Sequence, residues 1–106
     1  MCGISGIVSF GSSKQSIAEN LRLMSVQMRN RGPDDEGFLF VYRDEEKPKT
    51  FFGDDSTPEV KNALSANYSG KHIKEAFGIL AHGGFAHRRL SIVDLSHNGH
   101  QPMCTA

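Results

Sequence analysis

The alternation of apolar and polar residues at the start of the chain predicts a β-strand over residues 2–10. Glycine weakens a strand, so Gly3 and Gly6 indicate that another group approaches this backbone closely. Residues 11–13, one glycine and two serines, are typical of a turn. The period of two assigns Cys2, Ile4, Gly6, Val8 and Phe10 to one face and Gly3, Ser5 and Ile7 to the other.

A helical period follows over residues 14–29. Its apolar stripe consists of Ile17, Leu21, Met24 and Met28, which we interpret as core packing. Serines 12 and 16 each begin a capping-box pattern, so two starting points stay open. The Gly-Pro pair at 32–33 ends the helix.

The run Phe38–Tyr42 is continuously apolar, which predicts a second strand covered on both faces. It follows a polar turn at residues 31–37. Strand, helix and second strand are therefore expected within residues 2–42.

Residues 43–78 differ in composition, and we interpret them as an insertion between two strands. A charged segment at 43–49 is expected to form a loop tip. Ser56 or Thr57 is expected to cap a short helix, with Pro58 just inside it. The acidic pairs of this segment do not fit the spacing of a calcium-binding loop, so no metal is expected here. The helix would present the apolar residues Val60, Ala63 and Leu64.

A third strand is predicted over residues 87–95, after the Gly83-Gly84 pair, which is expected to kink or bulge its beginning. Residues 96–102 are rich in turn-forming residues. The alternation assigns Leu90, Ile92 and Asp94 to one face and Arg89, Ser91, Val93 and Leu95 to the other.

Composition limits the class of protein. The 106 residues allow one small domain at most. The 12 basic and 12 acidic residues cancel, so the charge favours neither nucleic acid nor an anionic membrane as partner. No apolar run suits a transmembrane helix, no secretory signal is present, and two cysteines make no disulfide framework. We expect a cytoplasmic protein, and we expect the chain, which ends without a cap or charged tail, to be part of a longer one.

Histidines and a cysteine near the end of the chain raise the question of zinc. They include one close pair, His97-x-x-His100, and none of the usual zinc-binding spacings. A solvated turn accounts for that pair equally well, so no metal site is predicted. The residues concerned are His82, His87, His97, His100 and Cys104.

Cys2 is the sharpest chemical feature of the sequence. Removal of Met1 would leave a thiol and a free α-amine on one residue. An α-amine titrates near pH ~7.7–8.0, so at neutral pH a fraction of it can accept the proton of the thiol. An N-terminal amine serving as base for its nucleophile is a known catalytic solution. The alternative is a buried free cysteine without a catalytic role.

The pair Arg88-Arg89 lies inside the third predicted strand. A charged residue in a strand usually points to solvent. If one of the two points into a pocket, its guanidinium suits a carboxylate held by two hydrogen bonds. A nucleophilic cysteine with such an arginine describes acyl transfer from an amino-acid-like compound.

Three motifs occur in order along the chain. They are Met1-Cys2-Gly3-Ile4-Ser5-Gly6, the turn Arg31-Gly32-Pro33-Asp34-Asp35-Glu36-Gly37, and His87-Arg88-Arg89-Leu90-Ser91-Ile92-Val93-Asp94-Leu95 with Gly99-His100-Gln101-Pro102-Met103 behind it. Together they resemble the start of the glutamine-hydrolysing asparagine synthetases, and more broadly the class II glutamine amidotransferases of the N-terminal-nucleophile hydrolase superfamily. The resemblance covers the chain apart from roughly residues 43–78.

The resemblance implies an α+β fold, part of a four-layer αββα sandwich, with residues 1–106 forming the N-terminal portion of a type-2 glutamine amidotransferase domain. Cys2 would attack the side-chain amide of L-glutamine, with its own α-amine as base. Arg89 would hold the α-carboxylate, and Arg31 would support the site structurally. The residues that would line the pocket are Leu90, Ser91, Ile92 and Val93.

Other parts of such an enzyme are not in this sequence. It contains no Asn-Gly-Glu, which supplies the oxyanion hole in the family, so we expect the chain by itself to be inactive. No cofactor is expected within it; ATP, Mg²⁺ and aspartate would belong to an absent synthetase domain, and a homodimer is left open. Two alternatives remain: an amidotransferase with another acceptor, such as a cell-surface sugar precursor, and a non-catalytic binding domain.

Overall fold

The structure, a computed structural model, describes residues 2–11, 13–43, 47–58, 61, 71–90 and 100–102. Seven strands, helix α1 and one short 3₁₀-helix have their bounds within these residues, and Pro58 and Lys61 are also helical. In chain order they are β1 (Gly3–Val8), β2 (Gln15–Ser16), α1 (Ala18–Gln27), β3 (Asp35–Val41), β4 (Lys49–Phe52), β5 (Lys71–His72), η1 (Ile73–Ala76), β6 (Leu80–Ala81) and β7 (Gly83–Arg89).

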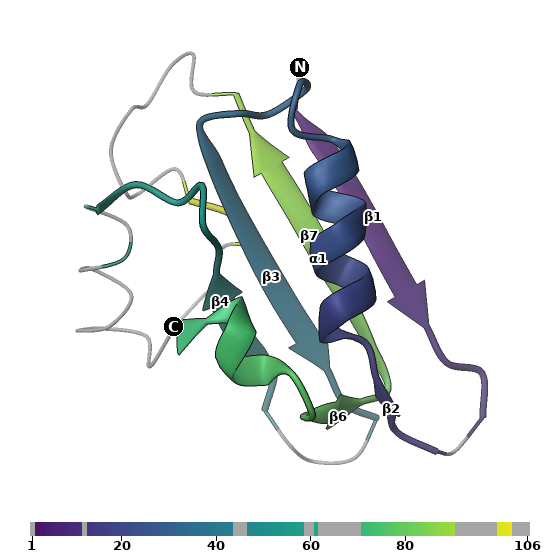
Figure 1. Ribbon diagram of the computed structural model, residues 1–106. Helices are drawn as coiled ribbons and strands as arrows, with labels where there is room; N and C mark the ends of the chain where they lie inside the picture. Colours follow the sequence, from purple (N-terminus) through teal and green to yellow (C-terminus); the bar gives the residue numbers. More distant parts are fainter. Residues whose placement is uncertain are drawn as a thin grey trace.

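Five of the strands form one mixed sheet in the order β1-β7-β3-β4-β5 (Figure 1). Its neighbours are antiparallel except β4 and β5, which are parallel. Strand β7 is an interior strand and pairs with both β1 and β3. The α+β class is therefore confirmed.

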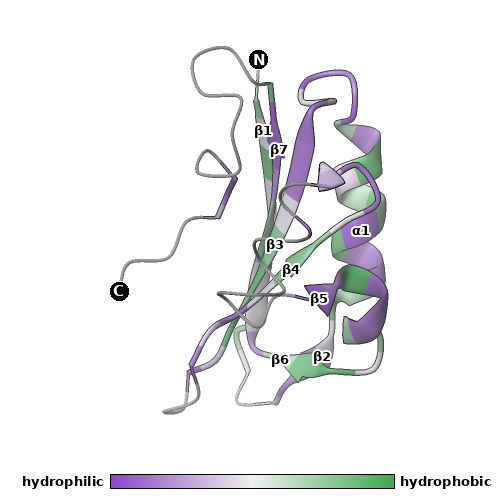
Figure 2. Ribbon diagram, turned by 90° about the vertical axis from the view of Figure 1, so that its left-hand side faces the viewer, coloured by the Kyte–Doolittle hydropathy of each residue, from purple (hydrophilic) through white to green (hydrophobic). Residues whose placement is uncertain are grey.

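Helix α1 covers one face of this sheet, as the edge-on view in Figure 2 shows. The predicted stripe begins correctly, because Ile17 and Leu21 are buried between helix and sheet. The facing strands contribute mainly large aromatic side chains, and burial of such a side chain is worth roughly 1.5–3 kcal/mol. The core consists of Ile17, Ala18, Leu21, Phe38, Phe40, Phe51, Ile73, Ala76, Ala81 and Ala86.

Helix α1 is shorter than the sequence pattern predicted. It begins at Ala18, its N-cap is Ile17, and no side chain caps it, so both capping-box predictions are wrong. The reason is a competing interaction: the backbone of Gln15 and Ser16 is extended and pairs with β6. Residues 14–17 therefore lead into the helix without belonging to it.

Strand β3 begins earlier than predicted, because residues of the predicted polar turn join it at Asp35. The segment 43–78 contributes β4 and β5, which extend the main sheet beyond β3. Near the predicted short helix, the Lys61 N–H donates to the Thr57 carbonyl at 3.0 Å. Val60, Ala63 and Leu64 lie outside the described residues.

The Gly83-Gly84 pair does not form the predicted bulge. Its register is continuous, with Gly84 opposite Ile7 on β1 and Phe40 on β3. A Cβ at Gly84 would lie 2.8 Å from the Cδ1 atoms of both Ile17 and Leu21. Glycine is therefore required here because helix α1 packs directly on the backbone of β7.

Substitution Gly84→Ala is expected to destabilise the protein by about 1–3 kcal/mol, because the added methyl group must push α1 away from the sheet. The matched control is Gly11→Ala, where a Cβ meets nothing closer than 3.9 Å. Urea unfolding of both variants measures the difference. Equal midpoints for the two variants would show that the helix does not rest on Gly84.

The sheet face opposite α1 carries exposed apolar side chains. Ile4 is 70% exposed, Val8 58% and Phe85 42%. The predicted alternation in the first strand is confirmed, but the face with Ile4 and Val8 is the exposed one. The buried face is the one that carries Gly3, whose Cβ position is only 3.0 Å from Met28 Sδ.

Candidate active site

The candidate site lies at one end of the sheet, where β1 and β3 begin and β7 ends (top of Figure 1). Gly3 and Glu36 are both register partners of Arg88. One step further, Asp35 pairs with Arg89. Because β1 and β7 are antiparallel and Gly3 lies opposite Arg88, Cys2, which precedes Gly3, lies near Arg89 and Leu90.

Cys2 is exposed, and its Sγ accepts a hydrogen bond from the backbone N–H of Leu90 at 3.4 Å. The two residues are 88 positions apart in the sequence. The alternative of a buried cysteine is therefore wrong, and the contact joins two of the residues expected in the site.

Arg89 is half-buried at the end of β7, and its carbonyl accepts a hydrogen bond from the Asp34 N–H at 3.1 Å. Because side chains alternate along a strand, Arg89 lies on the sheet face opposite α1 and Arg88 on the face toward it. Ser91, Ile92 and Val93 lie outside the described residues. The Arg31 N–H donates to the Met28 carbonyl at 2.9 Å, in the turn that follows the helix.

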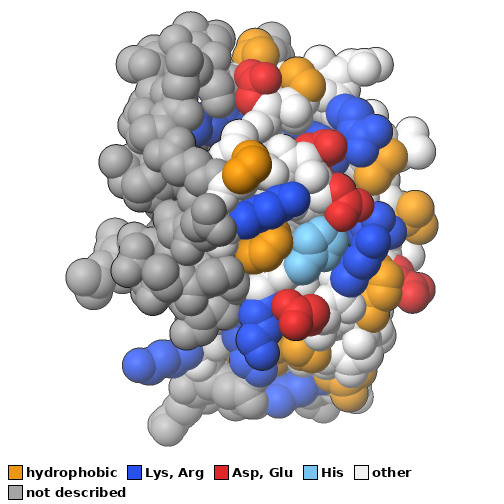
Figure 3. All heavy atoms as spheres, turned by 60° about the vertical axis from the view of Figure 1, so that its left-hand side comes forward, with side chains coloured by type: hydrophobic (Ala, Val, Ile, Leu, Met, Phe, Trp, Pro, Cys, Tyr) orange, Lys and Arg blue, Asp and Glu red, His pale blue; other side chains and the backbone are white. Residues whose placement is uncertain are grey.

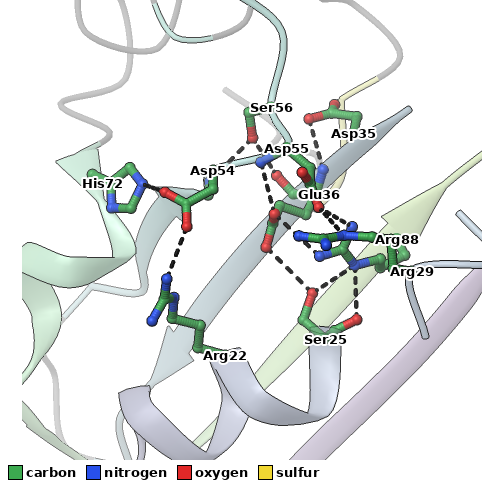
Figure 4. A network of polar contacts seen from close by, with 11 residues as sticks. Arg22, Ser25, Arg29, Asp35, Glu36, Asp54, Asp55, Ser56, His72 and Arg88 are labelled. Carbon is green, nitrogen blue, oxygen red and sulfur yellow. Dashed lines mark hydrogen bonds and ion pairs between the residues drawn. The ribbon is translucent and has the colours of Figure 1, made fainter. Parts of the chain in front are cut away.

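Arg88 is completely buried, against the expectation that strand charges point to solvent. Its Nε donates to the carbonyl and the Oγ of Ser25, at 2.8 and 3.0 Å. Its Nη1 donates to Asp55 Oδ2 at 2.7 Å and its Nη2 to Glu36 Oε2 at 3.2 Å. Figure 4 shows these groups converging from α1, β3, β7 and the segment after β4. A buried charge requires such partners, since unpaired burial is very costly.

Glu36, the carboxylate partner of Arg88, is itself 4% exposed. Its Oε2 also accepts the Asp55 N–H at 2.9 Å, and its backbone carbonyl accepts the Ser56 hydroxyl at 2.7 Å. A Cβ at Gly53 would lie 2.3 Å from the Glu36 carboxyl carbon. The loop after β4 is therefore fitted closely around this carboxylate.

Two neighbouring aspartates make separate contacts. Asp55 receives hydrogen bonds from Arg88 and from Arg29; burial raises its pKa, but these two guanidinium groups outweigh burial and lower it. Asp54 bonds to Arg22 and His72, each at 2.8 Å. The hydrogen bond from Arg22 is the main reason why the pKa of Asp54 falls to about 2.

A buried pair of side chains, Asp35 and His100, lies on the sheet face opposite α1 and joins β3 to residues 100–102. His100 Nδ1 and Asp35 Oδ2 are 2.6 Å apart, and both residues are buried. The segment that carries His100 lies over Gly37, whose Cβ position is 3.0 Å from the His100 ring. Near them, burial lowers the pKa of His87; Asp35 opposes this effect, and His100 and Arg89 add to it.

This pKa shift predicts a pH effect on stability. The unfolded chain protonates His87 near pH ~6.5, whereas the folded protein resists protonation. Stability from His87 is therefore present above that pH and lost as the pH falls through the folded pKa. The free energy of unfolding of the His87→Gln variant, measured in urea, is expected to rise relative to that of wild type as the pH falls from 7.5 to 5. A difference in unfolding free energy between the two proteins that stays constant over this pH range would contradict the lowered pKa of His87.

Within the described part of the chain, no group of three or more His, Cys, Asp or Glu side chains is arranged to hold a metal ion. His97 and Cys104 lie outside that part. Acidic and basic side chains are interspersed on the face shown in Figure 3. No helix among the described residues is long and apolar enough to cross a membrane.

Comparison with known proteins now bears on the site. The chain is similar to the N-terminal part of a glutamine-hydrolysing asparagine synthetase, so the resemblance carried by its three motifs is confirmed. The relative is a protein of Methanocaldococcus jannaschii provisionally named asparagine synthetase 2 (glutamine-hydrolysing). It is 36% identical over 103 residues, which are 97% of this chain and 13% of the relative. No family model matches the chain, and no solved structure matches it.

Sequence reasoning missed the Arg88 network. Glu36 was placed in a polar turn and Asp55 at the entry to the predicted short helix, and their distances from Arg88 along the chain, 52 and 33 positions, hide the pairing. One signal was available: adjacent arginines in a strand must point to opposite faces. With one face covered by a helix, one of the two had to be buried.

Proposed function

We propose that this chain is the glutamine-hydrolysing part of an ATP-dependent asparagine synthetase, releasing ammonia from L-glutamine for transfer to aspartate. The similarity to the Methanocaldococcus jannaschii protein supports the class of enzyme. The observation that carries the proposal is the contact of the Leu90 N–H with Cys2 Sγ. It brings the end of β7 to a sulfur that the sequence singles out as a nucleophile.

The proposed reaction starts from Cys2 with Met1 removed. The α-amine takes the thiol proton, and the sulfur attacks the side-chain amide carbon of glutamine. The C–N bond breaks, the nitrogen leaves as ammonia with the proton from the amine, and a γ-glutamyl thioester remains. Water then cleaves the C–S bond, giving glutamate and the free thiol. The Leu90 N–H stabilises negative charge on sulfur before the attack.

Substrate recognition is proposed to rest on Arg89. Its guanidinium can hold the glutamine α-carboxylate through two parallel hydrogen bonds, which a lysine cannot reproduce. It lies beside Cys2 in the register of the sheet, so the carboxylate and the reacting amide would belong to one small molecule. The backbone of Leu90–Val93 is proposed to complete the pocket.

The finer fold assignment is also a proposal. The exposed Ile4, Val8 and Phe85 support a second sheet stacked on the face opposite α1, as in an αββα sandwich of the N-terminal-nucleophile hydrolase type. The aspartate, ATP and Mg²⁺ of the complete reaction are assigned to no residue of this chain. We place the protein in the cytoplasm.

The test is an assay of glutamine hydrolysis with the protein as its own cell produces it. Glutamate and ammonia are expected in equal amounts from L-glutamine, with L-asparagine a poor substrate. Purified protein that binds glutamine but releases no ammonia would favour the binding-domain alternative. Ammonia release with an acceptor other than aspartate would favour the alternative amidotransferase.

A further inference from the structure

Resting on the proposed function, the geometry assigns a further role in the site: we propose that Arg88 is a positioning residue, which holds the end of β7 so that the Leu90 N–H and Arg89 face Cys2. The described side-chain contacts of Arg88 are with Ser25, Glu36 and Asp55, and none of them joins Arg88 to Cys2. It acts through the backbone of its own strand.

Hydrogen bonds to three separate segments hold the side chain of Arg88 in place. All the guanidinium nitrogens are bonded, to Ser25 on α1, to Glu36 on β3 and to Asp55 after β4. Two cations and two anions meet there, because Arg29 also bonds to Asp55, at 2.8 Å. A planar fork with fixed donor directions can reach three segments at once, whereas an ammonium group is a single point charge.

The backbone of Arg88 is fixed as firmly as its side chain. It pairs with Gly3 on one side and Glu36 on the other, on an interior strand of the sheet. A Cβ at Gly32 would lie 2.4 Å from the Arg88 carbonyl carbon, so the turn after α1 rests directly on it. A shift of Arg88 therefore moves Arg89 and Leu90, and displacements of about 1 Å at a reacting group can cost as much as 10²-fold in rate.

Two adjacent aspartates provide a matched test. Asp55→Ala removes one anchor of Arg88. Asp54→Ala removes the bonds to Arg22 and His72; the bond to Arg22 also joins α1 to the loop after β4, and none of the described contacts of Asp54 reaches β7. Two measurements are made with the complete protein, as its own cell produces it: the rate of Cys2 alkylation by iodoacetamide at one fixed pH, and the kinetics of glutamine hydrolysis, which give kcat and KM.

Asp55→Ala is expected to raise KM on the order of tenfold and to change the rate of Cys2 alkylation, because Leu90 and Arg89 are displaced from Cys2. Asp54→Ala is expected to change both by less than about twofold. Arg88→Lys should behave like Asp55→Ala, since it keeps the charge but loses the fork.

A merely structural role would lower the unfolding midpoint and leave KM and the alkylation rate of the folded protein unchanged, and that result would overturn the proposal. Equal behaviour of the two aspartate variants would overturn it as well. If the complete wild-type protein hydrolyses no glutamine, the proposed function fails, but the alkylation rates still decide whether Arg88 positions the strand.

Discussion

Cys2→Ala is expected to lower glutamine hydrolysis by roughly 10⁴-fold or more, because it removes the nucleophile and no other group can form the thioester. Cys2 is exposed, and its described side-chain contact is the one with the Leu90 N–H. The substitution therefore removes few core contacts, and the unfolding free energy of the variant should lie within about 0.5 kcal/mol of the wild-type value. Ammonia release and urea unfolding are the two measurements.

The control for this substitution is Cys104→Ala, which removes the second of the two cysteines in the sequence. It is expected to keep wild-type hydrolysis, so a general effect of lost thiols would be visible. A Cys2→Ala variant that still hydrolyses glutamine within tenfold of wild type would remove Cys2 from the mechanism.

Arg88→Met is expected to cost about 3–5 kcal/mol of unfolding free energy, because it leaves the Glu36 carboxylate buried without its cation. Methionine fills similar space, so lost volume contributes little. The double variant Arg88→Met with Glu36→Gln should recover at least half of the loss, since no buried charge remains on either residue. Urea midpoints and slopes for wild type, the two single variants and the double variant give the four unfolding free energies of this double-mutant cycle.

The control for Arg88 is Arg22→Met. Arg22 pairs with Asp54, but the two side chains are 34% and 46% exposed, and such pairs are worth about 0–1 kcal/mol. If Arg88→Met cost no more than Arg22→Met, the ion network would not stabilise the protein. If the double variant were no better than Arg88→Met, the unpaired Glu36 charge would not be the cause.

The sequence predicted the parts of the fold that depend on local periodicity. The alternation in β1 and the beginning of the helix stripe were correct, because facing an apolar layer imposes a period on each element. The α+β class came from the resemblance carried by the motifs. Ser12 and Ser16 misled, since a capping pattern carries no information about the β6 residues that pair with β2.

The rest depended on contacts between distant residues. Gly84 was interpreted as a bulge because a glycine pair is compatible with either a bulge or a close approach, and only the packed helix decides between them. Arg88 was expected in solvent because its compensating charges, Glu36 and Asp55, lie far away in sequence. For the site, position and chemistry singled out Cys2, the resemblance added Leu90, and the structure adds the sulfur contact between them.

The most direct measurement is the mass of the N-terminal peptide after treatment with a glutamine analogue that carries an electrophilic carbon. The peptide is expected to begin at Cys2, without Met1, and to carry one label on that residue. Prior incubation with L-glutamine should slow the labelling, and Cys2→Ala should abolish it. A peptide that keeps Met1, or a label that forms elsewhere while Cys2 stays free, would contradict an N-terminal cysteine nucleophile.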